Sequence, residues 1–323
     1  MRSYHGLAPR TAVFSRLVDL ARPRVPAMDI DDIQAARTRT IPRGRLADRV
    51  TGGVHPGVGI TFGTAPARDD FEIPLRLYRP RALPDSRSDV PVVMWFHGGG
   101  WVLGNVVDYD PVCSTIAAEV GAVVVSVDYR MAPEHRAPTP AQDCVDATTW
   151  VQVSADVLRA DTSRMAVAGD SAGGNLAAVV AQVLRDHGIG VLRHQALVYP
   201  ATDLTMSSPS IDEHARGAIL DRPAVVAYLE HYLRPGHDRR DPLVSPLFGT
   251  LEGLPPTLVQ TADLDPIRDD GIRYADALRE AGVPVRLTNY LQVPHGFALF
   301  PGATPVGRQQ RWELVTELAQ ALH

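Results

Sequence analysis

The sequence predicts an α/β fold with a mostly parallel central sheet, flanking helices and a helical cap. From residue 90 onward, short and nearly continuous apolar runs recur, and segments of helical character separate them. Continuous apolar strands that alternate with helices are typical of a parallel sheet covered on both faces. More than 50 residues separate the run that ends at Tyr199 from the run that begins at Thr257. A single crossover needs far fewer, so we expect an inserted cap there.

The order of the strands follows from these runs. Residues 71–78 alternate with a period near two, which is typical of an early antiparallel strand. The expected strands of the parallel sheet are residues 90–96, 122–127, 165–168, 196–199, 257–260 and 283–287.

Two segments are candidates for the cap. Residues 1–50 carry one short apolar stripe and no β pattern. Within the insertion, at about residues 203–245, Asp221 and Pro223 mark a helix start as N-cap and first-turn proline. We therefore expect residues 1–50 to form the N-terminal part of the cap. Residues 51–323 then form the main α/β domain that contains the insertion.

The composition limits the function classes. The chain has 323 residues and a formal net charge of −5, which does not favour binding to nucleic acid. All 32 basic residues are arginine, so a lysine nucleophile or Schiff base is excluded. No apolar run predicts a signal peptide or a membrane span, and Cys113 and Cys144 form no C-x-x-C pair. We expect a cytoplasmic protein with two reduced, buried thiols.

A serine between two glycines carries the strongest functional signal. Ser171 lies in Gly169-Asp170-Ser171-Ala172-Gly173, after an apolar run and before an Ala-rich segment that favours a helix. This G-x-S-x-G pattern is typical of a nucleophile elbow, in which a tight turn pushes the serine hydroxyl out above the sheet. The helix that follows points free N–H groups at the place where an oxyanion forms. Small residues also occur at turns between a strand and a helix for close packing alone. A second motif is therefore needed to distinguish a catalytic serine from a packing turn.

A glycine-rich loop supplies the second motif. His97-Gly98-Gly99-Gly100-Trp101 follows the run at residues 90–96 directly. Consecutive glycines let the backbone approach a ligand and aim N–H groups at it, as acyl transfer to a serine requires. A phosphate cradle is the alternative, but the sequence has no G-x-x-x-x-G-K-[ST] or G-x-G-x-x-G pattern here. We expect His97 to orient the loop rather than to act as a base.

A serine nucleophile needs a base and an orienting acid. Behind a nucleophile elbow the chain order is serine, acid, histidine. His295 lies in a Pro-His-Gly turn after the last expected strand, and His323 is the other histidine beyond that strand. This position predicts His295 as the base. The acid is Asp263 or Asp265, which both follow the run at residues 257–260.

Five segments carry a family resemblance when they are taken together. They are H-G-G-G-W at 97–101, D-Y-R-M-A-P-E-H at 128–135, G-D-S-A-G-G at 169–174, D-L-D-P-I-R-D at 263–269 and P-H-G-F at 294–297. In this order, over about residues 70–300, the chain resembles the hormone-sensitive-lipase-like family of α/β-hydrolases, the bacterial family IV esterases. Met131 replaces a usual leucine, and Arg136-Ala137 stands where Pro-Phe is common, so loop packing differs from the family pattern.

The resemblance implies the α/β-hydrolase fold and a carboxylesterase for short-to-medium acyl esters that needs no cofactor. It favours Asp265 over Asp263, because Asp-Pro is the family pattern. Ser171 is then the nucleophile and His295 the base, with Asp265 holding the imidazole. The resemblance also implies that Asp170 is a structural carboxylate behind the elbow.

The expected oxyanion donors are backbone N–H groups from the two motifs. They belong to Gly98, Gly99 and Ala172, of which Ala172 follows the nucleophile at the helix N-terminus. The expected substrate pocket consists of apolar side chains from the cap and the loops: Phe14, Leu17, Trp101, Tyr199, Leu220 and Tyr228. Glu213-His214 and Glu230-His231 do not form an H-E-x-x-H motif, so we expect no metal site.

Two other functions fit the same motifs. An amide, lactone or carbamate hydrolase uses the same triad, and the sequence does not separate these reactions from ester hydrolysis. A non-catalytic ligand-binding member of the fold is expected to lack a triad residue, whereas all three are present. The resemblance further implies a possible homodimer through the strand near Val283–Tyr290.

Overall fold

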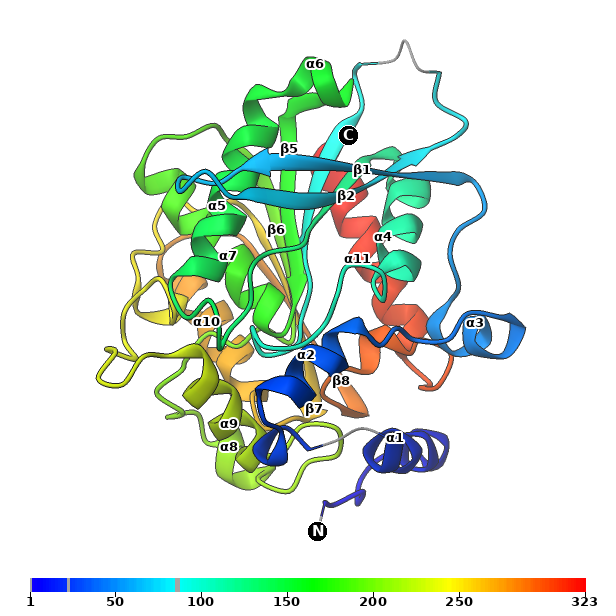
Figure 1. Ribbon diagram of the computed structural model, residues 1–323, viewed down its shortest axis with the longest axis vertical. Helices are drawn as coiled ribbons and strands as arrows, with labels where there is room; N and C mark the ends of the chain where they lie inside the picture. Colours follow the sequence, from blue (N-terminus) through cyan, green and yellow to red (C-terminus); the bar gives the residue numbers. More distant parts are fainter. Residues whose placement is uncertain (1, 22–23, 85–87) are drawn as a thin grey trace.

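A computed structural model describes residues 2–21, 24–84 and 88–323. Its centre is an eight-stranded sheet in the order β1-β2-β4-β3-β5-β6-β7-β8 (Figure 1). The strands from β4 to β8 run parallel to one another, while β1 and β2 are antiparallel to their neighbours. The strands are β1 (Val58–Pro66), β2 (Glu72–Pro80), β3 (Pro91–Phe96), β4 (Val123–Val127), β5 (Asp161–Asp170), β6 (Leu192–Val198), β7 (Thr257–Leu264) and β8 (Val285–Pro294).

The helices precede, connect and follow these strands. They are α1 (Pro9–Ala21), α2 (Ile30–Thr38), α3 (Arg45–Thr51), α4 (Asp110–Ile116), α5 (Thr139–Val153), α6 (Ala155–Leu158), α7 (Ala172–Asp186), α8 (Ser210–Glu213), α9 (Arg222–Tyr232), α10 (Arg268–Glu280) and α11 (Gly307–Leu322). Short helical turns lie at Val25–Ala27, Ala117–Gly121, Pro246–Phe248 and Phe297–Leu299. The predicted mostly parallel sheet with flanking helices is confirmed. Within the described ranges, every helix is too short or too polar to cross a membrane.

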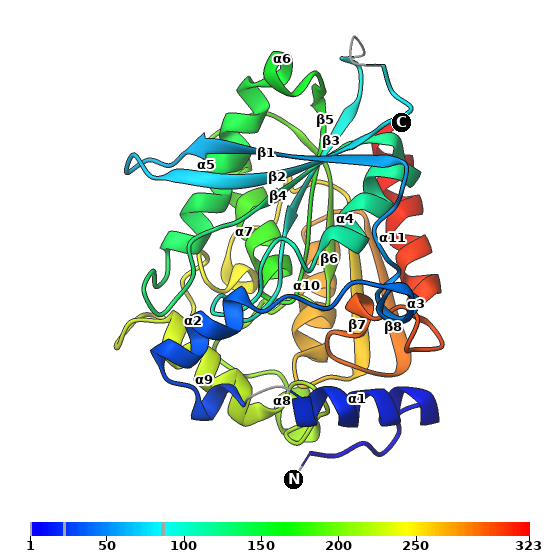
Figure 2. The ribbon, with the colours of Figure 1, turned by 45° about the vertical axis from the view of Figure 1, so that its right-hand side comes forward.

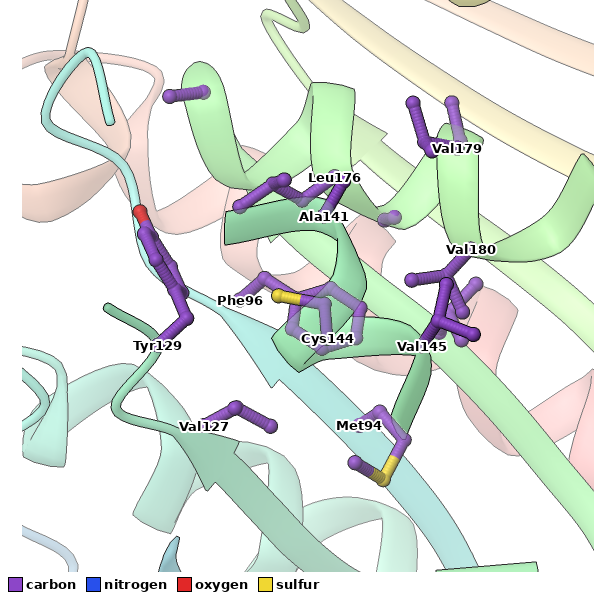
Figure 3. Packing of buried hydrophobic residues seen from close by; sticks show 14 of the residues in the cluster. Met94, Phe96, Val127, Tyr129, Ala141, Cys144, Val145, Leu176, Val179 and Val180 are labelled. Carbon is purple, nitrogen blue, oxygen red and sulfur yellow. The ribbon is translucent and has the colours of Figure 1, made fainter. Parts of the chain in front are cut away.

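Apolar side chains cover both faces of the sheet. Alternate residues of one strand enter different cores, as Met94 and Trp95 of β3 do. Helices α5, α7 and α10 pack on the face that includes Met94, and α4 and α11 pack on the other face. Figure 3 shows the first core, where Cys144 of α5 and Leu176 of α7 lie close to Phe96. This two-sided burial explains why the strands read as continuous apolar runs.

The N-terminal helices and the insertion lie at one end of the molecule. Figure 2 shows α1, α2, α8 and α9 at the end where the parallel strands finish. The guanidinium of Arg2 pairs with Asp19 of α1 and with Asp221, the N-cap of α9. The backbone N–H of Ile219 also donates to Asp19. The N-terminus lies at this end, and the C-terminus lies far from it (Figure 1).

A helix in each segment begins with a side-chain cap, and the cap of α9 at Asp221 is the predicted one. Asp29 accepts the N–H of Asp32 in a capping box, and Asp221 accepts the N–H of Ala224. Each carboxylate satisfies an N–H group that has no partner within its helix, which stabilises the first turn by roughly 1 kcal/mol.

Candidate active site

The nucleophile elbow joins β5 to α7. Ser171 has φ 55° and ψ −119°, a strained conformation, and it is the residue between the two elements. The flanking glycines are sterically required. A Cβ atom on Gly173 would lie 1.9 Å from the carbonyl oxygen of Phe96, and one on Gly169 would lie 2.4 Å from that of Gly173. The turn thus closes tightly enough to raise the serine above the sheet edge.

Three residues from distant parts of the sequence meet at this elbow. The Nε2 atom of His295 lies 2.9 Å from the Oγ atom of Ser171, and Nδ1 lies 2.7 Å from Oδ2 of Asp265. Asp265 is fully buried, and its second oxygen accepts the N–H of Ile267. With Nδ1–H donated to the carboxylate, Nε2 accepts a hydrogen bond from the Ser171 hydroxyl. The structure therefore brings together the three residues that the sequence motifs single out.

Asp263, the alternative acid, has a different set of partners. Its two oxygens accept the backbone N–H groups of Gln292 and Val293, at the end of β8. These bonds fix the strand end that leads into His295. Asp263 thus helps to place the loop of the histidine, while Asp265 contacts the imidazole itself.

The glycine loop departs from the expected set of oxyanion donors at Gly98. The N–H of Gly98 donates to Oδ1 of Asp170 and to the hydroxyl of Tyr109, both at 2.9 Å, so it is not available to a substrate. Among the described residues, the N–H groups of Gly99, Gly100 and Ala172 have no acceptor. Gly100 therefore offers an unpaired N–H group that the sequence reasoning did not single out.

Both remaining loop glycines are needed for their conformation and space. Gly99 has φ +119° and Gly100 has φ +63°, values that L-residues rarely adopt. A Cβ on Gly99 would lie 2.1 Å from the carbonyl oxygen of Leu103, and one on Gly100 would lie 2.3 Å from the ring of Tyr228. The loop can present its N–H groups only without side chains.

Asp170 joins the elbow to this loop. Besides the N–H of Gly98, its carboxylate accepts the hydroxyls of Tyr109 at 3.1 Å and of Tyr199 at 3.4 Å. Burial raises the pKa of Asp170 to about 6, although the hydrogen bonds from Tyr109 and Gly98 oppose the rise. Near pH 7 the ionised carboxylate therefore holds Gly98, which directly precedes the unpaired N–H groups of Gly99 and Gly100.

His97 also braces the loop. Its Nδ1–H donates to the carbonyl of Gly98 at 2.8 Å, and its ring stacks on Tyr129 with centroids 4.4 Å apart. The hydroxyl of Tyr129 donates to the His97 carbonyl at 2.7 Å. Burial lowers the pKa of His97, so the neutral ring is favoured. These contacts fit an orienting residue rather than a base.

Arg37 of α2 holds the loop from the side of the N-terminal segment. Its guanidinium donates to the carbonyls of Val102 at 2.8 Å and Ala132 at 2.5 Å, and to the carboxylate of Glu134. Burial alone would raise the pKa of Glu134, but hydrogen bonds from Arg37 and Gln34 outweigh it and lower the pKa to about 2. No sequence motif pointed to Arg37, because two of its partners are backbone carbonyls.

The expected pocket residues lie in different environments. Tyr228 rests against Gly100, next to the free N–H groups. Leu220 is buried in a small apolar cluster with Ile211, Ala224 and Ile267. Phe14 of α1 packs on Phe300, with ring centroids 4.8 Å apart.

Three of these pocket expectations are wrong. Leu17 is exposed on α1, because the polar face of that helix points inward. Tyr199 is fully buried behind His295, where it donates to Asp170. Trp101 is buried against Tyr232, so its ring supports the loop instead of facing a substrate.

Comparison with known proteins relates this chain to proteins that are named as esterases and ester hydrolases. The model of a family described by its alpha/beta hydrolase fold matches residues 93–299. Carboxylesterase NlhH of Mycobacterium tuberculosis is 44% identical over 257 residues, which cover 78% of this chain and 79% of that protein. Ethyl acetate hydrolase of Pseudomonas putida is 32% identical over 294 residues, 90% of this chain and 92% of that protein. A hyperthermophilic esterase from Pyrobaculum calidifontis superposes with a TM-score of 0.86 at 36% identity, covering 97% of this chain and 98% of its own.

Proposed function

Because this chain belongs to the alpha/beta hydrolase family and is an ester hydrolase, we propose that Ser171, His295 and Asp265 catalyse the reaction. The supporting observation is the hydrogen-bonded chain from Asp265 Oδ2 through the imidazole to Ser171 Oγ, at 2.7 and 2.9 Å. Such an alignment makes a neutral hydroxyl a usable nucleophile.

The proposed reaction has two similar halves. Ser171 Oγ attacks the ester carbonyl while His295 Nε2 takes the hydroxyl proton. The N–H groups of Gly99, Gly100 and Ala172 stabilise the negative oxygen. His295 then protonates the leaving alcohol, which leaves an acyl group on Ser171. A water molecule then attacks this acyl-enzyme while His295 takes its proton, and His295 returns that proton to Ser171 Oγ as the acid is released. Asp265 stays ionised and stabilises the imidazolium in both halves.

We also propose short-to-medium acyl esters as substrates. The relative named ethyl acetate hydrolase supports small esters, and Tyr228 closes the space next to Gly100. A cap formed by residues 1–50 and about 203–245 is part of this proposal, and the ion pair of Arg2 with Asp221 supports it. Turnover of p-nitrophenyl esters from two to sixteen acyl carbons tests the preference. A rate that rises toward the longest chains would contradict it.

A substitution at the nucleophile tests the mechanism directly. Ser171→Ala is expected to lower kcat for p-nitrophenyl butyrate by more than ~10³-fold, because the attacking atom is absent. The exposed Ser163 at the far end of β5 offers a matched control, and Ser163→Ala is expected to keep wild-type turnover. A fluorophosphonate probe is expected to label Ser171 alone. Turnover that survives in Ser171→Ala would reject the mechanism.

A homodimer through β8 remains a proposal. This strand is an edge of the sheet, so its outer side can pair with another strand along Val285–Tyr290, while near its end the carbonyl of Gln292 accepts the N–H of Ala8. Light scattering in solution tests it, and a monomeric mass at all concentrations would refute it.

A further inference from the structure

Helix α1 exposes its large aliphatic side chains and buries hydroxyl groups. Val13, Leu17 and Leu20 are 62%, 61% and 85% exposed, and their spacing of i, i+4 and i+7 places them in one stripe. The buried residues of the helix are Thr11 and Ser15, whose hydroxyls have no partner among the described residues. An ordinary surface helix buries its apolar side chains and exposes its polar ones. The exposed apolar stripe of α1 therefore indicates a surface that a partner covers.

Several contacts fix this orientation. Phe14 packs on Phe300, and Asp19 accepts the hydroxyl of Tyr4 and the N–H of Ile219. Arg2 bonds to the same carboxylate. Rotating the stripe inward would break these bonds, because Asp19 and Phe14 lie on the faces that would turn outward. The stripe therefore faces away from the protein body.

Basic residues flank the stripe. At ~3.6 residues per turn, Arg10 and Arg16 lie on its two sides, and both are exposed. Residues 1–24 contain five arginines and one aspartate, a net charge of +4 in a chain whose total is −5, and of these arginines Arg2 and Arg24 pair with Asp221. An apolar stripe between cations is the pattern of a helix that lies in the surface of an anionic membrane.

The helix also lies at the catalytic end of the molecule. Figures 1 and 2 place α1 at the same end of the molecule as α8 and α9, below the ends of the parallel strands. The nucleophile elbow follows β5 at this end. We propose that α1 docks the protein reversibly on an anionic lipid surface, with Val13, Leu17 and Leu20 in the acyl boundary and Arg10 and Arg16 at the headgroups. Docking in this way brings the site close to esters that partition into lipid.

Vesicle binding tests the proposal without any substrate. The full chain is sedimented with vesicles of phosphatidylglycerol and phosphatidylcholine (3:7), and with vesicles of phosphatidylcholine alone. We expect the wild type to prefer the anionic vesicles and to lose binding as salt increases. The triple variant Val13→Gln, Leu17→Gln, Leu20→Gln is expected to bind at least ~10-fold more weakly, because it has no apolar stripe. Arg10→Gln with Arg16→Gln is expected to remove the preference for anionic vesicles.

A matched control exists at the other end of the molecule. Val153 at the end of α5 and Val157 of α6 are as exposed as the stripe, and α6 lies far from α1 (Figure 1). Val153→Gln with Val157→Gln is expected to bind vesicles like the wild type.

Three results would overturn the proposal. They are a wild type that does not bind anionic vesicles, a triple variant that binds them as well as the wild type, and equal loss in the Val153 and Val157 control. A wild-type dimer that becomes monomeric in the triple variant, without vesicle binding, would instead assign the stripe to a second copy of the chain. Turnover of soluble p-nitrophenyl acetate is measured in parallel and is expected to be unchanged. Its absence in the wild type would refute the esterase mechanism and leave the vesicle result intact.

Discussion

Trp101 of the glycine loop and Tyr232 of α9 stack face to face, with ring centroids 4.3 Å apart and an interplanar angle of 5°. One turn earlier on α9, Tyr228 rests on Gly100. From another side, Arg37 of α2 bonds to the carbonyl of Val102. The loop with the free N–H groups is thus held by two helices that lie far from it in the sequence. Its geometry depends on both of them.

Removing the stack is expected to slow catalysis. Tyr232→Leu takes away the flat surface under Trp101, so the N–H groups of Gly99 and Gly100 lose their fixed position. We expect kcat to fall by ~10-fold or more, with a loss of stability of about 1–3 kcal/mol. Steady-state kinetics and thermal unfolding measure the two effects. Tyr232→Phe is the control, because the Tyr232 hydroxyl has no partner among the described residues and the stack is kept. A Phe variant as slow as the Leu variant would contradict this role.

The guanidinium of Arg37 is expected to be irreplaceable by lysine. A single ammonium group cannot bond to Val102, Ala132 and Glu134 together. We expect Arg37→Lys and Arg37→Met both to lower kcat by ~10-fold while KM changes by less than ~3-fold. Arg193→Met, at an exposed arginine, is the control. If Arg37→Lys restored wild-type kcat, the charge alone would be sufficient and the positioning role would be wrong.

Replacing the carboxylate of Asp170 with a neutral amide is expected to change kcat more than it changes KM, and to lower kcat. In Asp170→Asn, one amide oxygen has to replace two carboxylate oxygens that accept Gly98, Tyr109 and Tyr199. One donor then loses its partner, and the loop shifts. We expect kcat to fall by ~10- to 100-fold, which corresponds to about 1–3 kcal/mol. Asp146→Asn, at the partner of the half-exposed Arg68, is the control and is expected to leave kcat unchanged. Equal losses in both variants would show that the effect is general rather than local.

The free energy of unfolding is expected to decrease as the pH rises, because of the buried carboxyl of Asp270. This carboxyl is fully buried at the start of α10, where it accepts the hydroxyl of Ser208 and the N–H of Asp203. Burial raises its pKa to about 8, and the charges of Asp203 and Asp265 add to the rise. The folded protein therefore holds this proton between about pH 4 and pH 8, where the unfolded chain has lost it. Stability from this group is complete below pH 4 and is lost as the pH rises through 8.

The matched variant is Asp270→Asn, which stays neutral. The charged groups around the site are Asp203, Asp265 and Arg273, of which Arg273 bonds to Asp203 and to Ser208. Urea unfolding at pH 5 and pH 9 measures the free energy of unfolding at each pH. From pH 5 to pH 9 this free energy is expected to decrease by more than ~1 kcal/mol more in the wild type than in the variant. Parallel decreases in the two proteins would contradict the assignment.

The sequence predicted the sheet and the triad for reasons the structure makes plain. Buried parallel strands leave continuous apolar runs, and the carboxyl ends of those strands meet at one edge. Ser171, Asp265 and His295 each follow such a run, so their convergence could be inferred. The sheet order, and the way in which β1 and β2 join it, depend on contacts between distant elements that no local pattern encodes.

The misplaced residues also have physical explanations. The sequence does not distinguish the three consecutive glycines. In the structure, Asp170 and Tyr109 accept the N–H of Gly98, which removes it from the set of available donors. The periodicity around Leu17 defines a helix face but not what that face contacts. Anchoring by Asp19 and Phe14 turns this face outward.

The positions of the chain ends bear on how this protein should be attached to a solid support. The N-terminal arm is bonded to Asp221 beside the catalytic end, while the carboxyl terminus lies far from that end. A linker fused after His323 is expected to leave the catalytic end open to dissolved esters. Coupling through the first residues would press the catalytic end against the resin and slow every substrate in proportion to its size.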